Sequence, residues 1–264
     1  MTLAIKGSGI IANTGVIKIF VSEDEMPAFL GRANLKDSST SLTDISGAGA
    51  TFSLTPASGS VATFDSQGAL CYRDRGITSD ILAPEAVSIY SVHKKGDVST
   101  NVMEAYPFND GSLSTTAGYG VSIIERSPRG AAVVQYSTGY IYPDASSGNV
   151  RITITNSPVA ANVTIGDFVF RMLVIDPVAY ELREYTGYKG KLYKSVTQVS
   201  KDLTLRNRTQ AIRFGYHPNS PSSSNSSALR IAEVGVFDGA CTDAQAAKAY
   251  SDAIALQLTY GIEI

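Results

Sequence analysis

The chain has 264 residues, of which 44% are hydrophobic and 17% charged, and its formal net charge is −2. All-β sandwiches and barrels often reach about 200–250 residues as one unit, so one large domain is expected. The charged fraction lies below the roughly 25% of ordinary soluble domains, and the 23 Gly and 14 Tyr suit turns and strands. This slightly acidic balance offers no attraction to a phosphate backbone, so nucleic acid is not an expected partner.

We expect neither a secretory leader nor a membrane span in this sequence. No apolar run in the sequence reaches the roughly 18 residues of a membrane span, so membrane insertion is not expected. Polar residues and glycines interrupt the apolar residues between 1 and 20, so no signal peptide is predicted. We therefore expect the protein to be made in the cytoplasm, and we expect Cys71 and Cys241 to be buried free thiols.

Residues 1–25 differ in character from the rest of the chain. Apolar bursts at 3–5, 10–11 and 16–21 are separated by polar residues and glycines. This pattern predicts either an edge strand or an N-terminal arm that pairs with a neighbouring subunit, and with the arm we expect a homo-oligomer. Residues 26–264 are expected to form one β-sandwich.

Several segments of the main body have the length and composition of strands. They are rich in β-branched or aromatic residues, and turn-forming residues bound each of them: 87–93, 120–126, 131–136, 150–155, 168–175, 191–196 and 211–216. The strict alternation in 151–155 predicts a strand with Ile152 and Ile154 facing a core. Many strands with no helix between them indicate an antiparallel sandwich.

One helix is predicted near the end of the chain. Thr242 and Gln245 have the spacing of a capping box. Apolar residues recur at 246, 249, 250, 253 and 254, which is the stripe of one helical face. Gly261 is a plausible stop signal, and residues 262–264 are expected as a short strand or a tail.

The segment 229–245, LRIAEVGVFDGACTDAQ, resembles the last strand and short helix of concanavalin A-like, laminin-G-like jelly-roll domains. Residues 42–49 (LTDISGAG) are similar to the opening motif of these domains, and 168–176 with 182–190 to their hairpin. The resemblance implies an all-β, antiparallel, concanavalin A-like jelly-roll β-sandwich with one short C-terminal helix. Such modules occur in phage virion proteins, so the resemblance also implies a tail, baseplate or capsid-surface protein that contacts other virion subunits.

The carboxylates do not form a recognisable catalytic pattern. Glycosidases on this fold need two carboxylates that face the same bond, and no Glu-x-Asp-x-Glu motif is present. Glu181 and Glu184 are expected to form surface ion pairs around Arg183, and Glu233 to accept a structural hydrogen bond from nearby backbone. No catalytic residue is assigned and no enzymatic activity is predicted. A glycoside hydrolase remains an alternative if distant carboxylates converge in a groove.

No cofactor and no metal ligands are predicted, but calcium stays open. Some members of the resembled family bind calcium through Asp and Asn oxygens in loops at the rim of the sandwich. The candidate oxygen donors in this sequence are Asp44, Asp65, Asn109, Asp110 and Asp176. Turn formation is the alternative role, because Asp and Asn side chains bond their own backbone.

Tyrosines provide the candidate binding residues. Sugar sites combine aromatic faces with polar groups, and Tyr supplies both. Tyr136, Tyr140 and Tyr142 share parity, so an unbroken strand would project them from one face. Tyr185 and Tyr188 belong to a second group around the later hairpin. The alternative is that all these rings pack against the sandwich.

The sequence thus predicts a non-enzymatic virion module whose lectin-like sandwich binds host surface glycans. A purely architectural subunit without glycan binding is the alternative.

Overall fold

The structure is a computed structural model. It describes residues 8–13, 16–21, 25–36, 42–55, 61–72, 75–95, 103–109, 120–127, 135–144, 148–155, 163–199, 208, 210–215 and 228–264. For the strands before residue 25 and between 103 and 155, only the backbone and its pairing are described.

Two antiparallel sheets form the body of the molecule. The seven-stranded sheet has the order β12 (Gly148–Thr155), β11 (Gln135–Asp144), β10 (Gly120–Ser127), β9 (Met103–Asn109), β16 (Ala211–Phe214), β7 (Gly76–Leu82) and β4 (Phe52–Thr55). The larger sheet has the order β15 (Lys191–Gln198), β14 (Glu181–Tyr188), β13 (Val169–Asp176), β8 (Val87–Lys95), β17 (Leu229–Asp238), β6 (Gly68–Cys71) and β5 (Thr63–Asp65), with β3 (Phe29–Asn34) on β17.

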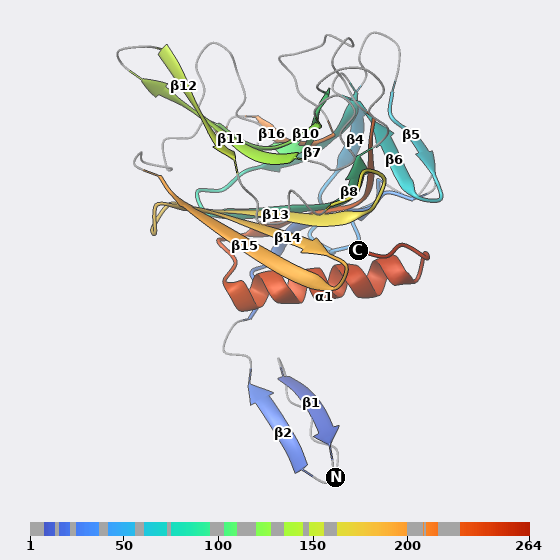
Figure 1. Cartoon of the computed structure of the whole chain (residues 1–264). Helices are drawn as coiled ribbons and strands as arrows, with labels where there is room; N and C mark the ends of the chain where they lie inside the picture. Colours follow the sequence, from blue (N-terminus) through green and yellow to red (C-terminus); the bar gives the residue numbers. More distant parts are fainter. Residues whose placement is uncertain are drawn as a thin grey trace.

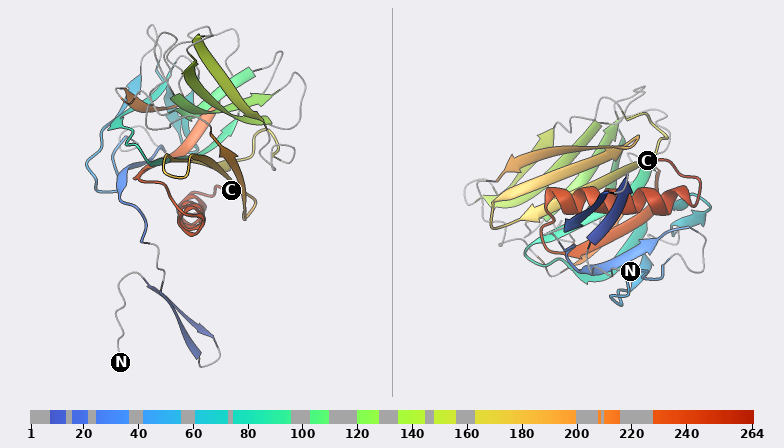
Figure 2. Two further views of the ribbon diagram at one scale, coloured as in Figure 1. Left: turned by 90° about the vertical axis from the view of Figure 1, so that its left-hand side faces the viewer. Right: turned by 90° about the horizontal axis from the view of Figure 1, so that it is seen from below.

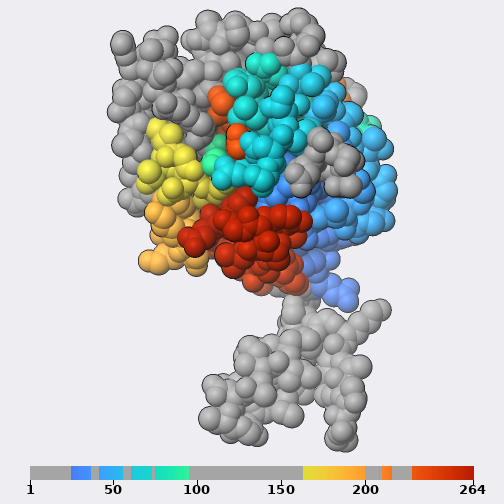
Figure 3. All heavy atoms as spheres, turned by 90° about the vertical axis from the view of Figure 1, so that its right-hand side faces the viewer, coloured from blue at the N-terminus to red at the C-terminus, as the bar shows by residue number. Residues whose placement is uncertain are grey.

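The sheets stack face to face, and the helix α1 (Asp243–Leu258) covers the outer face of the larger sheet (Figure 1). Seen from below, α1 runs across the strands of this sheet (Figure 2). In the space-filling view the C-terminal segment lies against early strands on one side and against the segment that follows residue 163 on the other (Figure 3). The last residues of the chain therefore complete a surface built from distant segments.

This three-layer arrangement produces two apolar cores. The inner core lies between the sheets and includes Ile77, Phe214 and Val236. The outer core lies between the larger sheet and α1 and includes Phe170 and Ala249. Because the central strands of the larger sheet are covered on both faces, β13 and β17 are buried along almost their whole length.

The helix packs closely on the sheet because a glycine of β14 leaves room for an aromatic ring of α1. A Cβ atom on Gly187 would lie 2.3 Å from the Tyr250 ring, so only glycine fits under this ring. Tyr250 also contacts Phe170, with ring centroids 5.4 Å apart, and Phe170 stacks on Tyr90 at 5.3 Å. These aromatic contacts fix the position of α1 on the sheet.

The predicted helix signals are confirmed. Thr242 is the N-cap, its hydroxyl accepts from the Gln245 backbone, and the Gln245 side chain returns the bond to the Thr242 backbone. The predicted stripe faces the sheet, with Ala246, Ala249, Tyr250 and Ala253 buried. Gly261 follows the helix end with a φ of 71°. Residues 262–264 form a tail with no strand pairing.

The antiparallel all-β prediction is confirmed, and six of the seven predicted segments lie in strands at nearly the predicted bounds. The segment 131–136 is different, because its strand β11 runs over Gln135–Asp144 and residues 128–134 lie outside the described residues. Ile152 and Ile154 lie in β12, but their side chains are not described, so which of them face a core stays a prediction.

Near the N-terminus, β1 (Ser8–Asn13) and β2 (Val16–Val21) pair only with each other. No described strand of the two large sheets pairs with this hairpin. Whether residues 1–25 contact another subunit stays a prediction.

The expected surface pair at Glu184 is wrong. Glu184 is buried and pairs with the fully buried Arg171, whose NH2 lies 2.8 Å from its Oε2, while Arg183 pairs with Asp176 and Glu181. The error has a simple cause: the side chains at 184 and 182 share a face, and the inner core lies on that face. Cys71 and Cys241 are both free and buried, as predicted.

Candidate ligand-binding pocket

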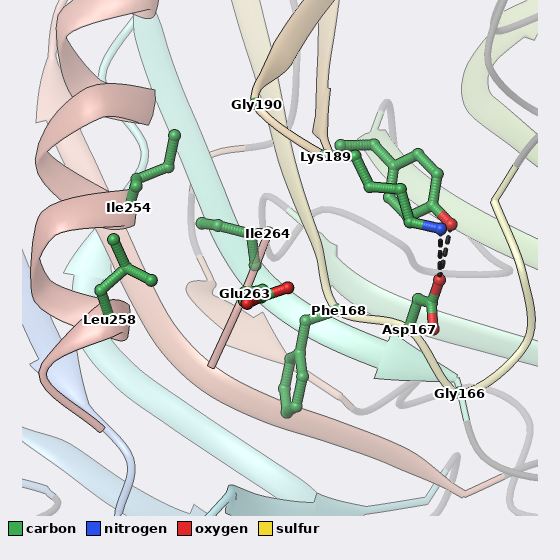
Figure 4. Close-up of a pocket in the computed structure, with 10 residues that line it drawn as sticks. Gly166, Asp167, Phe168, Lys189, Gly190, Ile254, Leu258, Glu263 and Ile264 are labelled. Carbon is green, nitrogen blue, oxygen red and sulfur yellow. Dashed lines mark hydrogen bonds and ion pairs between the residues drawn. The ribbon is translucent and has the colours of Figure 1, made fainter. Parts of the chain in front are cut away.

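A cavity of about 600 Å³ lies where the end of α1, the C-terminal tail, the 166–168 loop and the turn between β14 and β15 meet (Figure 4). Its lining residues come from these four segments: Gly166, Asp167, Phe168, Tyr188, Lys189, Gly190, Ile254, Leu258, Glu263 and Ile264. The volume falls within the roughly 300–1,000 Å³ of small-molecule sites.

The wall on the strand side is built by a tight turn. Tyr188 pairs with Lys191, and the two central residues Lys189 and Gly190 have φ angles of 49° and 74°. Two successive positive φ values define a type I′ turn, which suits the twist of a two-residue hairpin. The turn places the Lys189 side chain beside the 166–168 loop (Figure 4).

Polar groups converge on Asp167 from this turn. The Tyr188 hydroxyl donates to Oδ2 of Asp167 at 2.6 Å, and the Lys189 Nζ lies 3.3 Å from the same oxygen. Hydrogen bonding with Tyr188 and Asp167 raises the pKa of Lys189, so this ammonium stays charged at neutral pH. The Asp167 side chain remains 39% exposed, so solvent or a ligand can reach the carboxylate.

The opposite wall is apolar. Ile254 and Leu258 are four residues apart and therefore share one face of α1. The tail adds the buried Ile264, whose carbonyl oxygen accepts from the Tyr250 hydroxyl at 3.1 Å and from the Gly190 backbone at 3.2 Å. Leu258 is 54% exposed, so it presents apolar surface that no neighbour covers among the described residues. The pocket thus joins a polar wall to an apolar one.

The structure separates the five predicted tyrosines. Tyr136, Tyr140 and Tyr142 lie in β11 of the seven-stranded sheet, and β11 pairs with β10 and β12 without a register shift. Their side chains lie outside the described part of the chain, so their shared face stays a prediction. Tyr185 and Tyr188 lie in β14 of the other sheet, where an odd separation puts their side chains on opposite faces.

Only Tyr188 of these five lines the described pocket. Tyr185 is buried in the outer core, and its hydroxyl donates to Oδ1 of Asp243 at 2.6 Å. Its burial beneath α1 leaves the ring little surface for stacking on a ligand. Ligand binding by any of the five residues stays a prediction.

The candidate calcium ligands with described side chains act as turn and ion-pair acceptors. Asp44 accepts from the backbone N–H of Arg32, Ser46 and Gly49. Asp65 accepts from the Gln67 backbone and pairs with Arg230. Asp176 accepts from the Ala179 backbone and pairs with Arg183. Asn109 lies in β9 and Asp110 falls outside the described residues. Within the described part of the chain, no three acidic, His or Cys side chains cluster as a metal site.

Glu233 accepts hydrogen bonds from three side chains. The expected hydrogen bond from nearby backbone is therefore wrong. Arg32 and Tyr90 donate to its Oε1, each at 2.8 Å, and Gln257 donates to its Oε2 at 2.6 Å. Burial, together with the negative charge of Glu233, raises the pKa of Tyr90. This fully buried carboxylate therefore attaches α1 to the sheet, because one of its three donors, Gln257, lies in α1.

Asp167 is not among the residues predicted from the sequence, although the strand register contains a signal for it. The turn at 177–180 pairs Asp176 with Glu181, and continuing this antiparallel register toward the start of β13 sets Asp167 beside the turn at 189–190. No comparable pattern links the helix residues Ile254 and Leu258 to this loop, because only the packing of α1 brings them there.

No protein-family model matches the chain, and no curated protein matches it. Solved structures of botulinum neurotoxin binding domains are similar in fold. An HCR/D mutant has a TM-score of 0.55 at 13% identity, over 86% of this chain and 52% of that one. A structure of botulinum neurotoxin type C, described as entering cells through interaction with two ganglioside molecules, has a TM-score of 0.54 at 15% identity. The match covers 85% of this chain and 51% of that one. The binding domain of botulinum neurotoxin DC in complex with SialylT has a TM-score of 0.54 at 14% identity, over 85% of this chain and 51% of that one.

The chain spans about half the length of these structures. Identities of this size establish a shared fold alone. Together with the two stacked antiparallel sheets, they confirm the predicted fold class, an antiparallel jelly-roll β-sandwich with a C-terminal helix.

Proposed function

We propose that the protein is a non-enzymatic recognition module that binds glycans in the pocket around Asp167. The observation that carries this proposal is that one wall of the pocket is polar and the opposite wall is apolar. Within this cavity of about 600 Å³, the Tyr188 hydroxyl and the Asp167 carboxylate face the apolar side chains of α1. A sugar has the same two-sided character, with hydroxyl edges and C–H faces.

The fold supports the proposal at a general level. Among similar solved structures, one is described with two ganglioside molecules and another is a complex with SialylT. These structures share the sandwich with this chain, and their ligands belong to those proteins. They make recognition of a cell-surface glycan a reasonable use of the present sandwich.

The proposal includes a place in a phage virion. Its support is the resemblance of residues 229–245 and 42–49 to jelly-roll modules of virion proteins. In this setting the module would lie on a tail, baseplate or capsid surface and would assemble with other virion subunits. The separate β1–β2 hairpin offers an attachment segment, because it pairs with no described strand of the body.

The absence of enzymatic activity is also part of the proposal. Two buried carboxylates of the larger sheet, Glu184 and Glu233, are held by Arg171 and by Arg32, Tyr90 and Gln257 respectively. Neither is placed to exchange a proton with a ligand. The two carboxylates that line the pocket, Asp167 and Glu263, act in this proposal as acceptors for ligand donors, and Asp167 already accepts from Tyr188 and pairs with Lys189.

A glycan array probed with the purified full chain tests this function. We expect specific binding that Asp167→Ala weakens by about tenfold or more, because a hydrogen bond to a charged group contributes about 1.5–3 kcal/mol. Asp252→Ala is the matched control, since Asp252 pairs with Lys248 on the exposed surface of α1 and does not line the cavity.

The array also separates the alternatives. Binding that is lost on Tyr140→Ala but kept on Asp167→Ala would move the site to β11. Silence across bacterial and animal glycans would overturn the recognition function. If light scattering then showed an oligomer that disappears on deletion of residues 1–21, the protein would be an architectural subunit.

A further inference from the structure

We infer that the Asp167 pocket selects non-acidic sugar residues, neutral or amino-substituted, and rejects sialic and uronic acids. This inference rests on the proposed function and names the class of glycan that the same site accepts.

The charges that line the pocket carry the argument. Two carboxylates, Asp167 and Glu263, and one ammonium, Lys189, leave one net negative charge. The ammonium is already committed, because it lies 3.3 Å from Oδ2 of Asp167 and 4.8 Å from the centroid of the Tyr188 ring. A ligand carboxylate would therefore meet two like charges and compete with Asp167 for Lys189, the only cation among the described lining residues.

Hydrogen-bonding capacity leads to the same conclusion. The Tyr188 hydroxyl donates its proton to Asp167 and is not available to donate to a ligand. The acceptor capacity that remains is on the Asp167 and Glu263 carboxylates, and both residues are open to solvent. Hydroxyl, amide and ammonium groups are donors that match these acceptors, whereas a carboxylate is an acceptor only.

The apolar wall adds a geometric restriction. Figure 4 shows Ile254, Leu258 and Ile264 opposite the Asp167 and Lys189 side chains. A sugar with its C–H face on this wall turns its hydroxyl edge toward Asp167. A charged group turned toward the wall instead would lose water without gaining a partner. Among the lining residues that the structure describes, no orientation gives a ligand carboxylate a cation that is not already paired.

The test is isothermal titration of the full chain with single sugars. The neutral and amino-substituted probes are methyl galactoside, methyl N-acetylglucosaminide and glucosamine, and the acidic probes are N-acetylneuraminic acid and glucuronic acid. We expect at least one non-acidic probe to bind about tenfold or more tightly than either acidic probe. Asp167→Asn should weaken that binding by about tenfold, while Asp252→Asn should leave it unchanged.

Charge variants test the selectivity for non-acidic sugars separately from the glycan-binding function. Glu263→Gln removes one carboxylate and keeps the side-chain shape, so it should raise the affinity for the acidic probes and narrow the ratio between the two classes. Acidic sugars that bind more tightly than neutral ones, through Asp167 and Lys189, would overturn this inference and leave the glycan-binding function intact. Failure of every sugar and of the glycan array would overturn both. Thermal unfolding of each variant verifies that it is folded.

Discussion

Gln257 near the end of α1 donates a hydrogen bond from Nε2 to Oε2 of Glu233 in β17, at 2.6 Å, and both side chains are fully buried. Lys36 donates to the other end of the Gln257 amide, at 2.5 Å. Arg32 and Tyr90 hold the second oxygen of Glu233. These contacts anchor the end of the helix that lines the pocket, so the polar network connects the sheet to the candidate site.

We predict that Gln257→Ala lowers the free energy of unfolding by about 2–3 kcal/mol, because it leaves an ionised buried acceptor short of a donor. Urea denaturation measures this change. Gln198→Ala is the control, since Gln198 is exposed and its side chain bonds to Glu181 at the sheet edge, and it should change stability by less than about 0.5 kcal/mol. Equal effects of the two substitutions would contradict the role given to the Glu233 network.

The buried pair of Arg171 and Glu184 leads to a second prediction. Arg171→Met should destabilise the protein by about 3–5 kcal/mol, because it strands the Glu184 carboxylate in the inner core. Burial raises the pKa of Glu184, and the Arg171 guanidinium opposes that rise. The double variant Arg171→Met and Glu184→Leu should be more stable than the single variant. Additive losses in a double-mutant cycle would show that the two side chains act independently.

Asp44 should make the free energy of unfolding depend on pH in the acidic range. Burial alone would raise its pKa, but hydrogen bonds from the Ser46 side chain and from the backbone of Arg32, Ser46 and Gly49 outweigh it and lower the pKa to about 2. The unfolded pKa is about 3.9, so the stabilisation is complete above about pH 5 and is lost as the pH falls toward 2.

We therefore expect the stability advantage of the native chain over Asp44→Asn to shrink by about 1 kcal/mol between pH 5 and pH 2.5, a figure reduced for solvent screening. Urea titrations of both proteins at the two pH values measure it. An advantage that stays constant across this range would contradict the depressed pKa.

The two thiols should be unreactive in the folded protein. Burial raises the pKa of Cys71 to about 12, and it raises that of Cys241 to about 11 against the opposing hydrogen bond from Ser88. At pH 8 a disulfide reagent should modify neither thiol within minutes, whereas in urea it should modify both. Rapid modification of Cys241 alone would reveal local opening where β17 leads into α1.

Much of the architecture follows from local sequence. The capping box at Thr242 and Gln245 sets the start of α1, because both hydrogen bonds involve residues three positions apart. The apolar stripe then determines which face of the helix is buried. Strand-length runs bounded by turn residues identify β8, β13 and β15 of the larger sheet, since β-branched and aromatic side chains favour extended backbone wherever they lie.

The tertiary structure decided which distant residues meet. The charge of Glu184 indicated a surface residue, yet strand pairing set it beside Arg171 on the buried face of β14. The pocket combines Asp167, Leu258 and Glu263, which come from a loop, a helix and a tail. Local pattern specifies helices and strands because their hydrogen bonds connect neighbours or regular repeats. A site assembled from separate segments depends on how the helix packs against the sheet, and that packing emerges only when the whole chain has folded.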